Sequence, residues 1–167
     1  NPAKEAEYRK RAADLVAQMT LHEKVSQMLS WAPAIERLGI PAYNWWSEGI
    51  HGVGRAGTAT VFPQAIGMAA AFDEDMMEQV GNAIGVEARG KYNMCRAHGD
   101  RDIFKGLTVW APNINIFRDP RWGRGHETYG EDPFLTSRLG VRFVEGMQGN
   151  DPDYLQAAAC AKHFAVH

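Results

Sequence analysis

The chain has 167 residues, of which 45% are hydrophobic and 23% charged, and its formal net charge is −2. These proportions are typical of a globular protein, and the negative balance excludes a protein held to nucleic acid by bulk electrostatics. No apolar run approaches the roughly 20 residues needed to cross a bilayer, so no membrane partner is expected. The first residues, Asn1 to Arg11, are polar and charged and contain no apolar core of a secretory signal. Cys95 and Cys160 match no metal-binding spacing and are expected to be free thiols.

A helical preface is expected at the start of the chain. The stretch from Ala6 to Met19 has the spacing of a helix. Thr20-Leu21-His22-Glu23 then fits a capping box, in which the side chains of the first and last residues satisfy free backbone donors at the start of a second helix. Gly39 ends this pattern, so the preface is predicted to occupy about residues 1–38.

Short apolar strands alternate with amphipathic helices after the preface. Strands are predicted at Tyr43 to Trp46, Ala65 to Phe72, Leu107 to Ile116 and Ala157 to Ala161. Two periodic helices are predicted behind Asp73 and behind Asp132-Pro133, which are good capping residues. The alternation implies a parallel sheet covered by helices, in one continuous α/β domain. Three or four such units would form half of an eight-stranded barrel.

A carboxylate lies among aromatic residues in the stretch from Tyr43 to Gly52. Aromatic rings around Glu48 would make a pocket that stacks on a sugar while the carboxylate accepts hydrogen bonds from hydroxyls. The alternative is that Tyr43, Trp45 and Trp46 belong to the core. That alternative accounts less well for Glu48, because burying an unpaired charge is costly.

The loop from Asn113 to Glu127 carries three arginines and a tryptophan. A guanidinium group offers a rigid fork of donors, which suits vicinal hydroxyls or a carboxylate. The indole of Trp122 would supply an apolar face for the carbon side of a sugar ring. The alternative is that these arginines pair with neighbouring acidic residues and lock the loop, the candidate partners being Asp119, Glu127, Glu131 and Asp132.

The dipeptide Lys162-His163 follows the last apolar strand directly. Lysine is almost never fully buried without a partner, so Lys162 needs a carboxylate or a ligand. His163 and His167 have the i, i+4 spacing of a metal-binding pair. Their segment begins in a strand and has no carboxylate at the second position, so neither a metal nor a cofactor is expected.

Several motifs, in order along the chain from about Met19 to His167, together resemble glycoside hydrolase family 3. They are Trp45-Trp46-Ser47-Glu48-Gly49-Ile50-His51-Gly52, Phe62-Pro63-Gln64-Ala65-Ile66-Gly67, Arg118 to Arg124, Tyr129-Gly130-Glu131-Asp132-Pro133 and Lys162-His163-Phe164. The resemblance implies that residues 1–167 are the N-terminal portion of a (β/α)8 TIM-type barrel domain. It also implies that four residues bind the sugar in the innermost subsite: Glu48, Arg124, Lys162 and His163.

The resemblance further implies a retaining exo-acting β-glycosidase that removes terminal non-reducing sugars from β-linked oligosaccharides, without a cofactor. Secretion or a periplasmic location is expected from the family. Many β-glucosidases of the family carry Asp at the position of Glu48, whereas the Trp-Trp-Ser-Glu form is typical of β-xylosidase-like members.

The catalytic residues of the family lie beyond the motifs found here. The nucleophile is an aspartate in a Ser-Asp motif downstream of Lys-His, and the general acid/base comes later, usually in a following domain. No catalytic residue is therefore expected in this chain, which alone should be inactive and should need the remainder of the barrel and the following domain. Two alternatives stay open, namely a non-catalytic carbohydrate-binding protein and a half-barrel completed by a second polypeptide.

Overall fold

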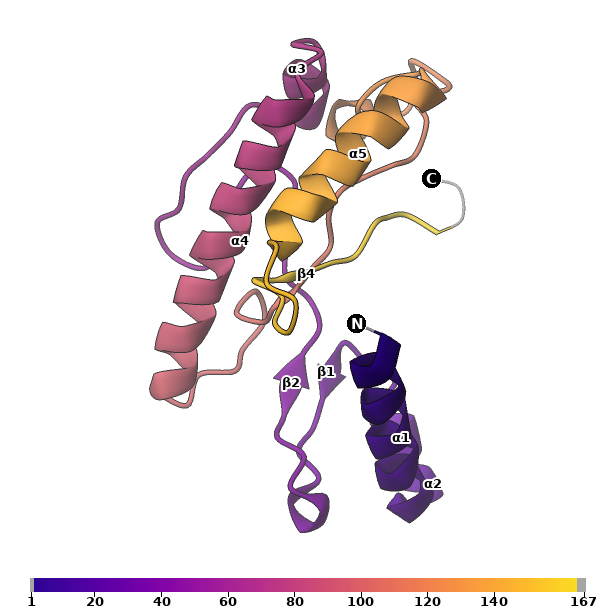
Figure 1. The fold of residues 1–167 in the computed structure, drawn as a ribbon, viewed down its shortest axis with the longest axis vertical. Helices are drawn as coiled ribbons and strands as arrows, with labels where there is room; N and C mark the ends of the chain where they lie inside the picture. The colour runs from indigo at the N-terminus through magenta and orange to yellow at the C-terminus, as the bar shows by residue number, and fades with distance from the viewer. Residues whose placement is uncertain (1, 165–167) are drawn as a thin grey trace.

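The structure, a computed structural model, describes residues 2–164 and places the N-terminal elements below a layer in which two long helices lie side by side (Figure 1). The N-terminal elements are α1 (Pro2–Gln18), α2 (Leu21–Ser26), β1 (Trp31–Ala32), a 3-10 turn η1 (Glu36–Leu38) and β2 (Tyr43–Asn44). The remaining elements are α3 (Ala65–Ala69), α4 (Glu74–Ala97), β3 (Thr108–Val109), a 3-10 turn η2 (Gly125–Glu127), α5 (Pro133–Gln148) and β4 (Ala158–Ala159). No helix of residues 2–164 is long and apolar enough to cross a membrane.

The preface contains the two expected helices and, in addition, a strand. The predicted capping box is present: the Thr20 hydroxyl accepts from the Glu23 N–H at 3.3 Å, and the Glu23 carboxylate accepts from the Thr20 N–H at 2.8 Å. After α2 the chain extends into β1, which pairs antiparallel with β2 so that Trp31 lies opposite Asn44. This hairpin leads the chain from the preface into the parallel sheet.

Within residues 2–164, three segments run side by side in parallel. Ser47, shortly after β2, pairs with Val109 of β3, and β3 pairs in turn with β4. The pairing continues beyond the strands, where Asn113 lies opposite Lys162 and the Ile114 N–H donates to the Lys162 carbonyl at 2.9 Å. The segments are therefore neighbours in chain order, as in the opening strands of an α/β barrel.

The strand predicted from Ala65 to Phe72 is wrong, because α3 occupies Ala65–Ala69. A short run of small apolar residues has no period that separates a buried strand from a buried helix. Alanine is also the strongest helix former, and Ile66 is the one β-branched residue in the run. In the described residues the chain thus makes two crossovers between parallel segments, through α4 and through α5, rather than the expected three or four strand–helix units.

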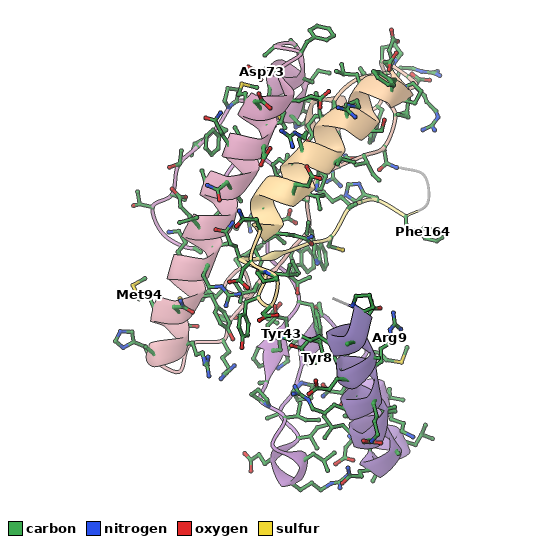
Figure 2. The ribbon with its side chains drawn as sticks, viewed as in Figure 1. Tyr8, Arg9, Tyr43, Asp73, Met94 and Phe164 are labelled. Atoms are coloured by element: carbon green, nitrogen blue, oxygen red, sulfur yellow. The ribbon has the colours of Figure 1, made fainter. Side chains whose placement is uncertain are left out.

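The helices predicted behind Asp73 and Asp132 are confirmed. The Asp73 carboxylate, at the start of α4 (Figure 2), accepts from the Met76 N–H at 2.9 Å. The Asp132 carboxylate accepts from the Leu135 N–H at 2.8 Å at the start of α5. The apolar faces of these helices meet in the core. The fully buried side chains that α4 and α5 bring to it are Met77, Ile84, Leu139, Phe143 and Met147.

Glycines allow α4 and α5 to approach closely. A β-carbon on Gly146 of α5 would collide with the Glu78 carbonyl oxygen of α4, and one on Gly81 of α4 would collide with the Phe143 carbonyl oxygen of α5. The helix backbones themselves are in contact at these points. Any larger residue there must push the helices apart.

We therefore expect Gly146→Ala to lower the free energy of unfolding by about 1–3 kcal/mol, the usual cost of overpacking a core. Gly90→Ala is the matched control, because Gly90 lies on α4 with open space around it. The control should raise stability by about 0.5–1 kcal/mol through helix propensity. Calorimetric melting of both variants beside the wild type measures this, and equal shifts would show that the helices do not touch at Gly146.

Candidate functional site

A pocket of about 410 Å³ opens at the C-terminal ends of the parallel segments. Three separate loops bring charged side chains into it: Glu48 follows the first segment, Arg124 and Glu127 follow β3, and Lys162 follows β4. The C-terminal face of such a sheet is where α/β barrels place their active sites. The pocket therefore lies where the fold class predicts a site.

Glu48 faces this pocket and is held from two sides. Its Oε1 accepts from the Trp46 indole N–H at 3.0 Å, and its Oε2 lies 3.3 Å from the Lys162 ammonium. The Trp46 ring stacks on Trp110, with centroids 4.7 Å apart and planes inclined by 18°. The Glu48 side chain remains 35% exposed, so its carboxylate is oriented and yet accessible to a ligand.

Lys162 is the buried cation of the site, with 9% of its side chain exposed. Its ammonium lies between two carboxylates, 3.3 Å from Glu48 and 3.8 Å from Glu127. The sequence prediction that Lys162 needs a partner is confirmed. The partners come from two loops that are distant in sequence.

Arg124 and Glu127 form a bidentate salt bridge across the η2 turn. The Arg124 Nε lies 2.5 Å from Glu127 Oε1, and its Nη2 lies 2.7 Å from Oε2. Burial pushes the pKa of Glu127 upward, but Arg124, assisted by Lys162 and His163, more than offsets this and holds that pKa below its ordinary value. The hydrogen bond to Glu127 raises the pKa of Arg124. Both groups are therefore charged at neutral pH.

His163 stands behind Arg124, with its Nε2 3.4 Å from the Arg124 Nη2. Asn115 fixes its backbone: the amide oxygen accepts from the His163 N–H at 2.6 Å, and the amide nitrogen donates to the His163 carbonyl at 3.1 Å. Asn115 is buried and lies on the segment that continues from β3. His163 thus contacts the charged cluster but is not one of the side chains that line the pocket.

Of the other two arginines of the loop, Arg121 pairs with an acidic neighbour, as the alternative interpretation held, whereas Arg118 donates to a backbone carbonyl. Arg121 forms a two-pronged pair with Asp119, at 3.0 and 2.6 Å, with its side chain 88% exposed. Arg118 donates to the Ile116 carbonyl at 3.2 Å. Trp122 packs against Phe117, with ring centroids 6.0 Å apart, and does not line the pocket.

Of the aromatic residues around Glu48, one lines the pocket and the others contribute to the surrounding structure. Tyr43 joins the sheet, because its hydroxyl accepts from the Leu107 N–H at 2.8 Å and lies 3.1 Å from the Thr108 hydroxyl. Trp45 packs edge-on against Tyr43. Of the three aromatics, Trp46 is the one that lines the pocket.

Sequence reasoning missed Glu127 as a member of the pocket and considered it only as a partner for loop arginines. The available signal was its i, i+3 spacing from Arg124, which a helical turn brings onto one side. Phe104 and Arg55 also line the pocket, with the guanidinium 5.3 Å from the ring centroid. Both come from loops whose path carries no periodic signal.

The described residues hold no group of three or more His, Cys, Asp or Glu side chains placed to bind a metal ion. His167, the second member of the predicted histidine pair, lies outside the described residues. Cys95 and Cys160 are free thiols, as expected.

The family model for the glycosyl hydrolase family 3 N-terminal domain matches residues 11–167. The chain is 50% identical over 162 residues to a xylan 1,4-β-xylosidase of Xylanibacter ruminicola, a match that covers 95% of the chain and 19% of that protein. It is also 50% identical over 175 residues to a probable β-D-xylosidase 7 of Arabidopsis thaliana, with 95% and 22% covered.

Solved structures resemble the chain over the same range. An exo-β-xylosidase of this family, XlnD, in complex with a xylobiose aziridine probe, matches with a TM-score of 0.82 and 39% identity over 95% of the chain and 21% of its own. The β-glucosidase DesR of Streptomyces venezuelae, in complex with D-glucose, matches with a TM-score of 0.71 and 33% identity over 92% and 19%. The predicted fold class, the N-terminal part of a (β/α)8 barrel, is confirmed. The chain spans about a fifth of the length of these relatives.

Proposed function

Since this chain belongs to glycosyl hydrolase family 3, we propose that the full-length protein is a retaining exo-acting β-glycosidase, a β-xylosidase or β-glucosidase. Its substrates would be β-linked oligosaccharides, from which it removes terminal non-reducing sugars. The observation that carries the proposal is the pocket in which Glu48, Arg124 and Lys162 converge from three loops. This chain would supply the sugar-binding half of the innermost subsite.

The chemistry of these groups suits the hydroxyls of one sugar ring. The accessible Glu48 carboxylate would accept hydrogen bonds from hydroxyls remote from the anomeric carbon. Arg124 and Lys162 are donors only, and they would bind other ring hydroxyls together with His163. Holding several hydroxyls at once orients the ring and favours its distortion toward an oxocarbenium-like transition state.

Glu127 does not suit either role in a catalytic pair of carboxyl groups. The lowered pKa of Glu127 keeps its carboxylate ionised, so it has no proton to give as a general acid. Both of its oxygens already accept hydrogen bonds from Arg124, so neither is free to act as a nucleophile. Retaining hydrolysis needs a nucleophile and an acid about 5–5.5 Å apart across the scissile bond. We propose that these come from the remainder of the barrel and from a following domain of the full-length protein.

The direct test is hydrolysis of nitrophenyl β-xyloside and β-glucoside by the full-length protein. Retention predicts that the sugar first released is the β-anomer, because two displacements restore the configuration. Proton NMR of the early reaction distinguishes the anomers. An α-anomer as first product would contradict the mechanism, and sugar binding without any turnover would favour the non-catalytic alternative.

Loss of a proposed sugar donor should weaken catalysis without unfolding the protein. We expect Arg124→Ala and Lys162→Ala each to lower kcat/KM by about tenfold or more, which corresponds to about 1.4 kcal/mol of transition-state stabilisation. Arg121→Ala is the matched control, since its exposed pair with Asp119 lies outside the pocket. Wild-type kinetics in either test variant would remove that residue from the site.

Glu48 is proposed to favour a pentose over a hexose. Glutamate reaches one methylene further than aspartate, so it should crowd the region where a hexose carries its hydroxymethyl group. A misfit of this size is worth about 1–3 kcal/mol, or a 10–200-fold preference for xyloside over glucoside in kcat/KM. Glu48→Asp should reduce that ratio in the full-length enzyme. A wild type that prefers glucoside, with a ratio unchanged by the substitution, would show that Glu48 is not the selector.

A further inference from the structure

The Glu127 carboxylate is the most heavily engaged acidic group in the pocket. Its two oxygens accept from Nε and Nη2 of Arg124, and Oε2 also lies 3.8 Å from the Lys162 ammonium. Its side chain is 16% exposed, against 35% for Glu48. Glu127 therefore faces two neighbouring cations and offers little carboxylate surface to a ligand.

The segment that carries Glu127 is held rigidly. Arg124 directly precedes the η2 turn and Glu127 is its last residue. Gly125 between them is buried, with the Phe117 ring filling the space of a β-carbon. Thr128, which is fully buried, closes the turn by donating from its hydroxyl to the Gly125 carbonyl at 2.7 Å. The carboxylate is thus presented by a fixed backbone rather than by a mobile loop.

The charges of the cluster alternate in space. Glu48 pairs with Lys162, Lys162 faces Glu127, and Glu127 pairs with Arg124. Removing the charge of Glu127 would leave two cations facing each other across a partly buried site. Among residues 2–164, Lys162 would then have Glu48 as its one carboxylate within 4 Å. It would therefore compete with the sugar for the group proposed to accept from the sugar hydroxyls.

From this geometry we infer that Glu127 is a positioning residue, which sets the places of Arg124 and Lys162 without touching the sugar itself. The inference rests on the proposed function, because it assigns Glu127 a part in the same glycosidase site. It adds a determinant of the rate beyond the groups proposed to bind the sugar. Its effect on catalysis must therefore pass through Arg124 and Lys162.

The test is a double-mutant cycle in the full-length enzyme. Glu127→Gln, which keeps the size and removes the charge, should lower kcat/KM at least tenfold in the wild-type background. In the Arg124→Ala background the same substitution should cost less than about threefold, because one of the groups it positions is already gone. Equal losses in both backgrounds, or a loss below twofold in the wild type, would overturn the inference.

Asp119→Asn is the matched control for the loss of an arginine partner on the same loop, and it should retain wild-type kcat/KM. Should Glu127→Gln fail to fold, Glu127→Asp keeps the charge and shortens the reach. It should give a loss of threefold or more that is again smaller in the Arg124→Ala background, and wild-type kinetics in Glu127→Asp would overturn the inference.

A structural readout separates this inference from the proposed function. If the wild-type enzyme hydrolyses neither glycoside, the proposed function fails and kinetics decide nothing about Glu127. The crystal structure of the Glu127→Gln protein (or of Glu127→Asp) then decides. Displacement of the Arg124 guanidinium or the Lys162 ammonium supports positioning, and unchanged places for both overturn it.

Discussion

The site depends on one constraint, the burial of the Lys162 ammonium. A charge with so little solvent contact is costly unless carboxylates lie beside it. Glu48 and Glu127 meet that need from 114 and 35 residues away along the chain, and each must therefore be delivered by its own loop. Parallel pairing of the three segments makes this possible, because their C-terminal ends meet at one edge of the sheet. The burial of Lys162 and the topology of the sheet thus support each other.

Helices with a strong period could be predicted from the sequence, whereas the type of one short apolar run and the true length of the strands could not. The capping residues Asp73 and Asp132 and the apolar stripes behind them located α4 and α5 correctly. The run from Ala65 to Ala69 has no such period, and the strand predicted there is in fact the helix α3. The strands themselves are short. The predicted strand from Leu107 to Ile116 is present only as Thr108–Val109, the pair that Ser47 and β4 flank, and no local pattern marks where that pairing ends.

The convergence of the site was predicted only in part. Motif position indicated that Glu48, Arg124 and Lys162 belong together, and the structure places all three in one pocket. Local spacing could not show which arginine of the loop turns inward. Arg121 and Arg124 each have a carboxylate close in sequence, Asp119 and Glu127, and each forms a two-pronged pair with it. The difference comes from the buried Gly125, which lets the η2 turn pack against Phe117 and directs the second pair toward Lys162.

The two glutamates of the pocket have different neighbours, and these neighbours suit the two carboxylates to different roles. An indole N–H and a lysine ammonium orient Glu48 while leaving a third of its side chain open. An arginine fork engages both oxygens of Glu127. A carboxylate with open surface can accept from sugar hydroxyls at small cost and keep its protein partners, because the hydroxyls replace hydrogen bonds with water. A carboxylate enclosed by two cations would have to break a charge-assisted pair to do so, which costs more than a hydroxyl returns. The open glutamate is therefore suited to binding and the enclosed one to holding the cations that bind.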